Sequence, residues 1–205
     1  MLSPAPSPPG NPLGPTDPLP HRPRRVLVAG PSGAGKTTLV AAIARRLGLP
    51  AYELDALHHG PNWTPRPEFV ADVEEFSARR QWAVEWQYGK VRRLLAERAD
   101  TMVWLDHPKS LVMSRVIWRT VSRRVRGEQL WNGNVEPPLR NMFTDPENVV
   151  RWSWRTYREV GDQVRALLTH PDVGQLVIVR LRGQRQVETW LAGPLNAVAQ
   201  RGDDE

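Results

Sequence analysis

One eight-residue segment limits what this chain can fold into more than any other. It runs from Gly30 to Thr37 and follows the pattern G-x-x-x-x-G-K-[ST]. A phosphate group needs several backbone N–H groups aimed at one point, and glycine lets the backbone approach that closely. Four apolar residues, 26–29, precede the segment, and a helical pattern opens at Lys36. We therefore expect a strand, a phosphate-binding loop and a helix, in that order.

This loop predicts that the chain binds a nucleoside triphosphate. Lys36 would reach the β- and γ-phosphates, and Thr37 would offer its hydroxyl to Mg²⁺. ATP is favoured over GTP because the guanine-reading motif Asn-Lys-x-Asp does not occur in the sequence. The residues expected to contact the nucleotide are Gly30, Pro31, Ser32, Gly33, Ala34, Gly35, Lys36, Thr37 and Thr38.

Short apolar runs alternate with helical patterns along the rest of the chain. Strands are predicted over 26–29, 51–54, 82–85, 101–105 and 175–181. Helices are predicted over 36–47, 68–80, 91–98, 109–126, 147–168 and 184–191, with irregular segments over 58–67 and 127–146. Such alternation predicts an α/β protein in which helices cover both faces of a parallel sheet.

The folded domain is expected to span residues 25–195. Residues 1–24 hold nine of the twenty prolines and little that is apolar, so we expect a disordered tail. The polar end, residues 196–205, is expected to be flexible. There is no cysteine and no apolar run that could cross a membrane. These features favour a cytoplasmic protein without a membrane partner, either a monomer or a homodimer.

Three carboxylates follow predicted strands and could complete the site. A phosphate-binding loop often works with an acidic residue at the end of a neighbouring strand, which holds Mg²⁺ or its water. We assign that role to Glu85 together with Thr37, and expect Glu85 to lie close to the substrate as well. Asp55 is expected to bind an acceptor and accept a proton from its hydroxyl, with a helix or turn cap as the alternative. Asp106, before Pro108, is interpreted as a structural cap.

A basic stripe is predicted on the long helix that ends near residue 126. Of the 28 basic residues of the chain 25 are arginine, which can grip phosphate oxygens with two N–H groups at once. Four arginines of this helix share a face, namely Arg115, Arg119, Arg123 and Arg126. We expect Arg123 and Arg126 to stabilise the transferring phosphoryl group and residues 123–146 to form a lid. Arg119 and Arg140 are expected to contact the substrate, and a solvated charged face is the alternative.

Two more side chains are expected to contact the acceptor. Trp63 follows Asn62 in an irregular segment, where its ring could stack on a substrate or simply pack against the protein. His58 is expected to make a polar substrate contact. A metal site at His58 and His59 is not expected, because adjacent side chains diverge and no third ligand follows at a suitable spacing.

Beyond the loop, several motifs make residues 25–192 resemble the adenylate-kinase-like group of P-loop kinases. Within that group the chain is most similar to the bacterial DNA topology modulation proteins. The motifs are Glu53-Leu54-Asp55-x-x-His58, Pro61-Asn62-Trp63, Arg98-Ala99-Asp100-Thr101-x-Val103-Trp104-Leu105-Asp106 and Leu130-Trp131-Asn132-Gly133-Asn134. The resemblance implies a three-layer P-loop NTPase fold with a five-stranded parallel sheet, a helical arginine-bearing lid and phosphoryl transfer to a small molecule.

The chain departs from these relatives at one place. They tend to carry Asp-Gly-Asn-Tyr where this chain has Glu85-Trp86-Gln87-Tyr88, so the carboxylate moves by one methylene and Trp86 is expected to fill space near the acceptor. Our interpretation is an ATP- and Mg²⁺-dependent kinase of a small hydroxylated or phosphorylated acceptor. The alternatives are a nucleotide-gated regulator that binds nucleic acid, which is less favoured, and a nucleotide-binding interaction protein with little catalysis.

Overall fold

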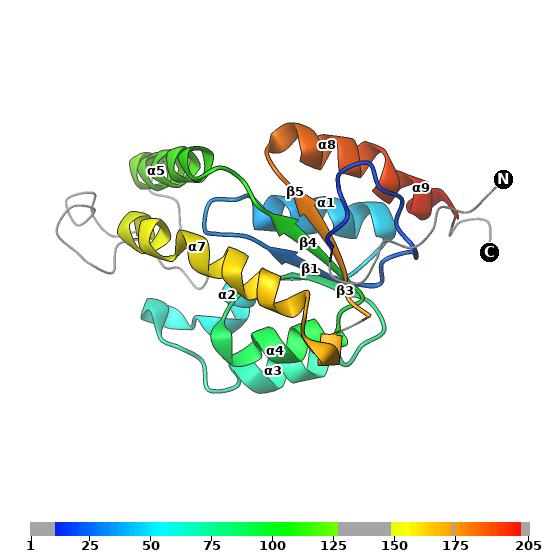
Figure 1. The fold of residues 1–205 in the computed structure, drawn as a ribbon. Coiled ribbons are helices and arrows are strands. Elements are labelled where there is room, and N and C mark those ends of the chain that lie inside the picture. Colours follow the sequence, from blue (N-terminus) through cyan, green and yellow to red (C-terminus); the bar gives the residue numbers. More distant parts are fainter. Residues whose placement is uncertain (1–10, 127–148, 174, 202–205) are drawn as a thin grey trace.

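A five-stranded parallel sheet forms the centre of the molecule (Figure 1). The computed structural model describes residues 11–126, 149–173 and 175–201, without the side chains of residues 62, 119–121, 123–126, 149–156 and 171. The strands are β1 (Arg25–Ala29), β2 (Ala51–Tyr52), β3 (Trp82–Glu85), β4 (Thr101–Leu105) and β5 (Val177–Leu181). They lie in the order β2-β3-β1-β4-β5 and pair in parallel throughout. The predicted α/β fold with a five-stranded parallel sheet is confirmed.

The middle of the sheet is buried on both faces. Every residue of β3 and β4 is buried, as are the last four residues of β1. Their apolar sequences suit strands that helices cover on both sides. Val28 of β1 pairs with Glu85 of β3 on one side and with Val103 of β4 on the other. The loops that leave β1 and β3 therefore meet at one edge of the sheet.

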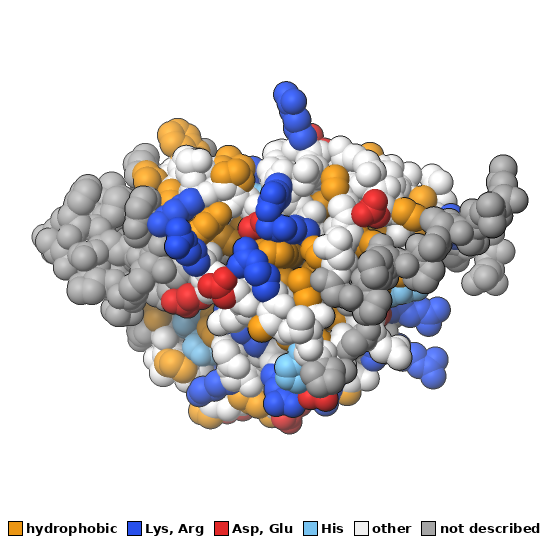
Figure 2. All heavy atoms as spheres, in the orientation of Figure 1, with side chains coloured by type: hydrophobic (Ala, Val, Ile, Leu, Met, Phe, Trp, Pro, Cys, Tyr) orange, Lys and Arg blue, Asp and Glu red, His pale blue; other side chains and the backbone are white. Residues whose placement is uncertain are grey.

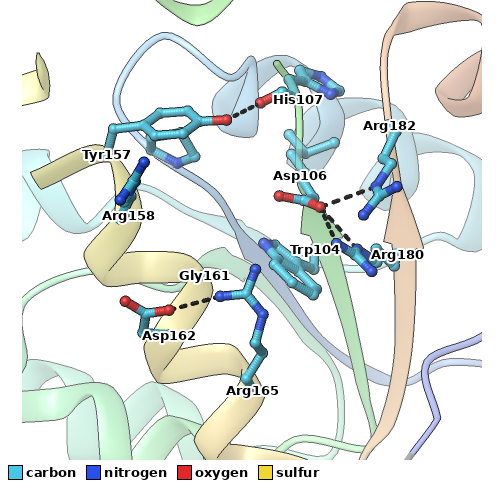
Figure 3. Close-up of a pocket in the computed structure, with 12 residues that line it drawn as sticks. Trp104, Asp106, His107, Tyr157, Arg158, Gly161, Asp162, Arg165, Arg180 and Arg182 are labelled. Carbon is cyan, nitrogen blue, oxygen red and sulfur yellow. Dashed lines mark hydrogen bonds and ion pairs between the residues drawn. The ribbon is translucent and has the colours of Figure 1, made fainter. Parts of the chain in front are cut away.

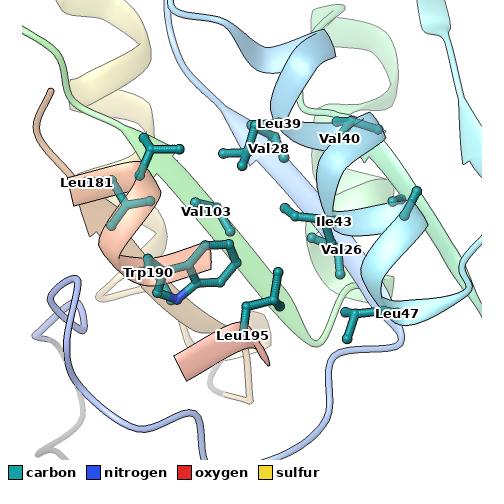
Figure 4. Close-up of a cluster of buried hydrophobic side chains, with 14 of the residues drawn as sticks. Val26, Val28, Leu39, Val40, Ile43, Leu47, Val103, Leu181, Trp190 and Leu195 are labelled. Carbon is teal, nitrogen blue, oxygen red and sulfur yellow. The ribbon is translucent and has the colours of Figure 1, made fainter. Parts of the chain in front are cut away.

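Helices cover both faces of the sheet. They are α1 (Lys36–Leu47), α2 (Leu54–His58), α3 (Phe69–Ser77), α4 (Gly89–Arg98), α5 (Lys109–Arg126), α7 (Val149–Leu167), α8 (Gln184–Ala192) and α9 (Pro194–Arg201), with short 3-10 turns at η1 (Pro61–Trp63) and η3 (Pro171–Val173). On one face α1, α8 and α9 bury a cluster that includes Ile43, Val103 and Trp190 (Figures 1 and 4). On the other face α3, α4 and α7 bury Trp82 and Trp104. Both tryptophan side chains are almost completely shielded from solvent there.

Residues 11–24 and 196–201 are more ordered than predicted. Leu13 forms an isolated parallel bridge with Val179 of the edge strand β5, and Leu19 is buried in the core. Arg22 donates hydrogen bonds to the carbonyl oxygens of Leu47 and Ala199. The predicted disorder is therefore wrong for residues 11–24. Composition indicates how much apolar surface a segment can bury. It does not show that the segment can bond to the unpaired backbone groups of an edge strand such as β5.

The predicted flexible end is also wrong in part, because α9 continues to Arg201 and buries Val198. A smaller difference concerns the strand predicted over 51–54. β2 ends at Tyr52 and α2 begins at Leu54, so Asp55 lies in the first turn of a helix and not at the end of a strand. No helix in the described part of the chain is long and apolar enough to span a lipid bilayer.

Candidate functional site

The phosphate-binding loop joins the end of β1 to the start of α1, as predicted. Gly33 and Gly35 have φ angles of +82° and +94°, a backbone conformation that residues other than glycine rarely adopt. Gly35 directly precedes α1, and no side chain caps the helix there. The N–H groups of the first turn and the positive end of the helix dipole are therefore available to an anion.

Helix α5 packs directly against this loop. A Cβ atom built on Gly33 would lie 2.4 Å from Cγ2 of Val116 and 3.1 Å from the carbonyl oxygen of Val112. Arg115, on the same helix, donates a hydrogen bond from Nη1 to the carbonyl oxygen of Ala34 at 3.4 Å. Glycine at position 33 thus serves two purposes, because it supplies the φ angle and leaves room for α5.

Three charged or polar side chains converge beside the loop. The hydroxyl of Thr37 donates to Oε1 of Glu85 at 2.5 Å, and Nζ of Lys36 lies 3.7 Å from Oε2 of the same carboxylate. Lys36 also donates to the carbonyl oxygen of Pro31 at 3.3 Å. Glu85 is buried, with 8% of its surface exposed. The structure therefore brings together the residues that the sequence assigned to phosphate and cation.

A second polar cluster surrounds Asp55. Its Oδ1 accepts hydrogen bonds from the hydroxyl of Tyr88 at 2.5 Å and from Nε2 of Gln87 at 2.9 Å. Burial, reinforced by the Asp55 carboxylate, raises the pKa of Tyr88, so this phenol keeps its proton and acts as a donor. Within the described part of the chain, Oδ2 of Asp55 has no hydrogen-bond partner. That oxygen can still accept a proton from a ligand.

Aromatic side chains enclose the Asp55 cluster. His58 stacks on Tyr88 with ring centroids 4.3 Å apart, and Nε2 of His59 lies 3.1 Å from the Tyr88 hydroxyl. Trp63, which is 37% exposed, meets the ring of His59 edge-on at 5.2 Å. Burial and then the charge of His59 lower the pKa of His58, which favours the neutral ring. The predicted grouping of Asp55, His58 and Trp63 is thus present.

Two of these aromatic residues have unusual backbone conformations. Trp63 and Tyr88 have φ angles of 59° and 60°, the only positive values found for residues other than glycine in the described ranges. Such a conformation costs an aromatic residue roughly 1–3 kcal/mol and commonly occurs where a site needs a fixed side-chain position. Here both residues lie on the Asp55 cluster.

Trp86 does not lie where the sequence suggested. It was expected to fill space near the acceptor, yet it is only 4% exposed and belongs to the hydrophobic core under α3, α4 and α7. Its Nε1 donates to the carbonyl oxygen of Arg92, and the Arg92 guanidinium lies 5.3 Å from the ring centroid. Successive residues at a strand end point to opposite sides, so the Trp86 ring is turned away from Glu85. That expectation was wrong.

Asp106 has a different role from the predicted cap. Its Oδ2 accepts hydrogen bonds from Nε and Nη2 of Arg180, and from Nε of Arg182 at 3.1 Å. Asp106 therefore joins the ends of β4 and β5 through ion pairs. The two arginines lie more than 70 positions further along the chain, so no local pattern could reveal the pairing.

A cavity of about 310 Å³ lies on the α1 side of the loop. Ala34, Gly35 and Thr38 form one wall, and Arg115 forms another. Gln184 and the apolar side chains Val187 and Leu191 of α8 also line it. Nη2 of Arg115 donates to Oε1 of Gln184 at 3.1 Å, which fixes the guanidinium over the start of α1. The cavity thus adjoins the loop and combines apolar walls with polar groups.

Several predicted residues lie outside what the structure describes. The side chains of Arg119, Arg123 and Arg126 and the whole of Arg140 fall there, together with most of the predicted lid over 123–146. Their roles stay predictions.

Four further residues lie at the site that were not predicted from the sequence. These are Gln87, Tyr88, His59 and His107. Gln87 and Tyr88 lie two and three positions after Glu85, so their position after a strand end next to the loop was an available signal. His107 offered the same signal, because it lies two positions after the end of β4, and β4 also pairs with β1. It is buried beside the loop, and its Nδ1 accepts a hydrogen bond from the backbone N–H of Gly183 at 2.9 Å.

Comparisons with known proteins agree with this arrangement. A family model described as "ATPase family associated with various cellular activities (AAA)" matches residues 26–130, which include the loop, β1 to β4 and α5. No curated protein matches the chain significantly. The narrower resemblance to DNA topology modulation proteins is not tested by these findings and stays a prediction.

Solved structures are similar to this chain at low sequence identity. A gluconokinase from Sinorhizobium meliloti 1021 is 23% identical with a TM-score of 0.50, and the alignment covers 90% of this chain and 98% of that one. A shikimate kinase from Acinetobacter baumannii is 18% identical with a TM-score of 0.48, covering 88% and 91%. At 23% identity the likeness to the gluconokinase concerns the fold alone.

Proposed function

The chain belongs to the ATPase family associated with various cellular activities (AAA), and on that premise we propose that it is a kinase that transfers the γ-phosphoryl group of ATP to a small hydroxylated acceptor. The observation that carries the proposal is the order of the strand ends. Along β2-β3-β1 the chain presents Asp55, then Glu85, then the phosphate-binding loop. A proton acceptor, a carboxylate for a cation and a phosphate site thus follow one another along one edge of the sheet.

The residues around the loop fit the triphosphate of ATP and Mg²⁺. The turn from Gly33 to Gly35 and the uncapped start of α1 offer N–H groups to phosphate oxygens, and Lys36 adds a positive charge. A hydroxyl and a carboxylate, from Thr37 and Glu85, are the hard oxygen ligands that Mg²⁺ prefers. Bound Mg²⁺ would neutralise part of the charge on the triphosphate.

The cavity beside α1 suits the nucleoside of the donor. Its apolar walls, Val187 and Leu191, can cover one side of a base, and the planar guanidinium of Arg115 can stack on it. Gly35 and Thr38 belong both to this cavity and to the loop region. A ligand that holds its phosphates in the loop would therefore reach the cavity with its base.

The Asp55 cluster suits the acceptor. Tyr88 and Gln87 hold Oδ1 of Asp55 and leave Oδ2 open, so the carboxylate is oriented before an acceptor binds. We infer that Oδ2 accepts the proton of an acceptor hydroxyl as its oxygen bonds to the γ-phosphorus, while the bond from that phosphorus to the β–γ bridging oxygen breaks. Trp63, on the rim of the cluster, would cover the acceptor. The fold that the chain shares with a gluconokinase fits a hydroxylated acceptor.

The test is a search for acceptor-dependent ADP formation by the full-length protein. ATP, Mg²⁺ and a panel of sugars, sugar acids, cyclic polyols, nucleosides and nucleotides are supplied, and ADP is measured with and without each compound. We expect one class of hydroxylated acceptor to raise ADP formation and to yield a phosphorylated product detectable by mass spectrometry.

Two variants make the result specific. Asp55→Asn should lower the acceptor-dependent rate about 100-fold or more while leaving the affinity for ATP unchanged, because it removes only the proton acceptor. Lys36→Ala should abolish ATP binding and transfer together. An ADP yield that never responds to any acceptor, or an Asp55→Asn enzyme as active as the wild type, would contradict the proposed kinase.

A further inference from the structure

A second cavity, of about 380 Å³, lies between α7 and the end of the edge strand β5 (Figure 3). Arg158 and Arg165 enter it from α7, and Arg180 and Arg182 enter it from β5 and the residue after it. Figure 2 shows Lys and Arg side chains around a hollow with hydrophobic atoms at its base on this face. The residues named in the proposed kinase reaction do not line this cavity.

The arginines of this cavity outnumber its carboxylates. Both Arg180 and Arg182 bond to a single oxygen, Oδ2 of Asp106, so one carboxylate serves two guanidinium groups. Asp162 pairs with Arg165 at 2.7 Å and is itself largely exposed.

Arg158 has no ion pair or hydrogen bond within the part of the chain that the structure describes. Among the described residues that line the cavity, four arginines face two aspartates, so two positive charges are in excess. Like charges held this close together favour an anion between them.

The base of the cavity strengthens this preference. Trp104 lies between the guanidinium groups of Arg165 and Arg180, which are 5.4 Å and 4.6 Å from its ring centroid (Figure 3). Trp104 and Leu105 are buried, so the base on which these guanidinium groups stand is apolar. Electrostatic attraction is stronger where water is partly excluded. The stacked guanidinium groups are also held in place, so less freedom is lost when a ligand binds.

We propose that this cavity is a second ligand site, which takes a compact polyanion with two or more phosphate or carboxylate groups. Two positive charges in excess match a ligand with at least two negative groups, and arginine holds such groups with paired N–H donors. The site is separate from the phosphate-binding loop, since only Pro31 of that loop lines it. It adjoins the nucleoside cavity, because Leu105 and His107 line both. A bound polyanion would therefore be separated from the nucleoside cavity by Leu105 and His107.

The experiment measures binding of pyrophosphate and of citrate by isothermal titration calorimetry. It uses full-length protein that carries Lys36→Ala, so that the phosphate-binding loop contributes little. We expect at least one of the two probes to bind, and the comparison between them tells phosphate from carboxylate recognition. The double variant Arg158→Gln, Arg182→Gln should weaken that binding about tenfold or more, because both side chains are exposed and each supplies an ionic contact.

Two controls separate a built site from general attraction to a basic protein. The double variant Arg45→Gln, Arg185→Gln removes the same charge from exposed positions that line neither cavity, and should leave the affinity unchanged. Asp162→Asn frees Arg165 from its carboxylate and should tighten binding by a factor of about two or more. Thermal melting of each variant confirms that it is folded.

The site would be refuted if neither probe binds, or if both double variants weaken binding equally. An Asp162→Asn protein that binds no tighter than its parent would also count against it. None of these outcomes depends on phosphoryl transfer. The second site can therefore be refuted while the kinase proposal stands, and the kinase proposal can be refuted while the second site stands.

Discussion

The hydroxyl of Thr37 and the carboxylate of Glu85 share a hydrogen bond of 2.5 Å, although 48 positions separate them in the chain. Thr37 and Glu85 come together because Glu85 pairs with Val28 in the adjacent strand. The end of β3 therefore lies beside the loop that follows β1. Lys36 completes the group at 3.7 Å from the second carboxylate oxygen. Substitutions in this group test most directly how the chain would bind ATP and Mg²⁺ in the proposed reaction.

The carboxylate of Glu85 should matter through its charge as well as its hydrogen bond. Glu85→Gln keeps an oxygen that can accept from Thr37 but supplies no negative charge to a cation. We expect the acceptor-dependent rate to fall about 100-fold and the Mg²⁺ concentration for half-maximal rate to rise. Glu85→Asp, which keeps the charge, should retain more activity than Glu85→Gln at saturating Mg²⁺. Equal Mg²⁺ dependence in all three proteins would show that Glu85 does not serve the metal.

Tyr88 should act by positioning Asp55. Tyr88→Phe removes the hydroxyl that donates to Oδ1 of Asp55 and leaves the ring that stacks on His58. We expect kcat to fall about tenfold, with little change in the affinity for ATP, because only the orientation of the proton acceptor is lost. The decisive measurement is kcat together with the affinity for ATP, because a positioning role lowers the first and spares the second. A Tyr88→Phe enzyme with wild-type kcat would remove Tyr88 from the mechanism.

Gly33 and Gly48 offer a matched test of the close packing of α5 on the loop. Both have positive φ angles, +82° and +69°, but a Cβ on Gly33 would collide with Val116, whereas one on Gly48 meets nothing within 4 Å. Gly48→Ala should cost only about 1 kcal/mol of stability through backbone strain. Gly33→Ala should cost more and also weaken ATP binding. Urea unfolding and ATP titration measure both effects, and equal losses in the two variants would contradict the packing argument.

His107 should make the protein less stable in mild acid. Burial, assisted by the positive charge of Arg115, lowers the pKa of His107 below the ordinary value of 6.5. The unfolded chain then binds a proton more readily than the folded one, so stability is complete above pH 6.5 and declines as the pH falls from there. The charge of Asp106 opposes the shift but does not cancel it.

The measurement is the urea midpoint of unfolding between pH 7.5 and 5.0. His107→Gln should give a shallower decline than the wild type, whatever its absolute stability. His58, whose pKa is also lowered, contributes to the same pH range, so His58→Gln serves as the comparison. If the wild-type and His107→Gln curves run parallel, His107 does not titrate on unfolding.

Much of the architecture followed from local pattern. Apolar runs of four or five residues, with glycine, proline or charge at their ends, located the four longer strands to within about two residues. The loop motif placed Lys36 and Thr37, and Glu85 could be assigned beside them because parallel strands end at a common edge. Asp55 was assigned to the acceptor on similar grounds, although it begins a helix and does not end a strand.

Residue patterns alone located the phosphate-binding loop, the alternation of strands and helices, and the residues at the ends of β1 and β3. They could not show that Trp86 turns into the core, that Asp106 binds Arg180 and Arg182, or that Leu13 pairs with β5. The reason is physical. Helix and strand patterns arise from neighbours a few positions apart, whereas a salt bridge, a buried ring or an edge pairing depends on which surfaces meet after the chain has folded.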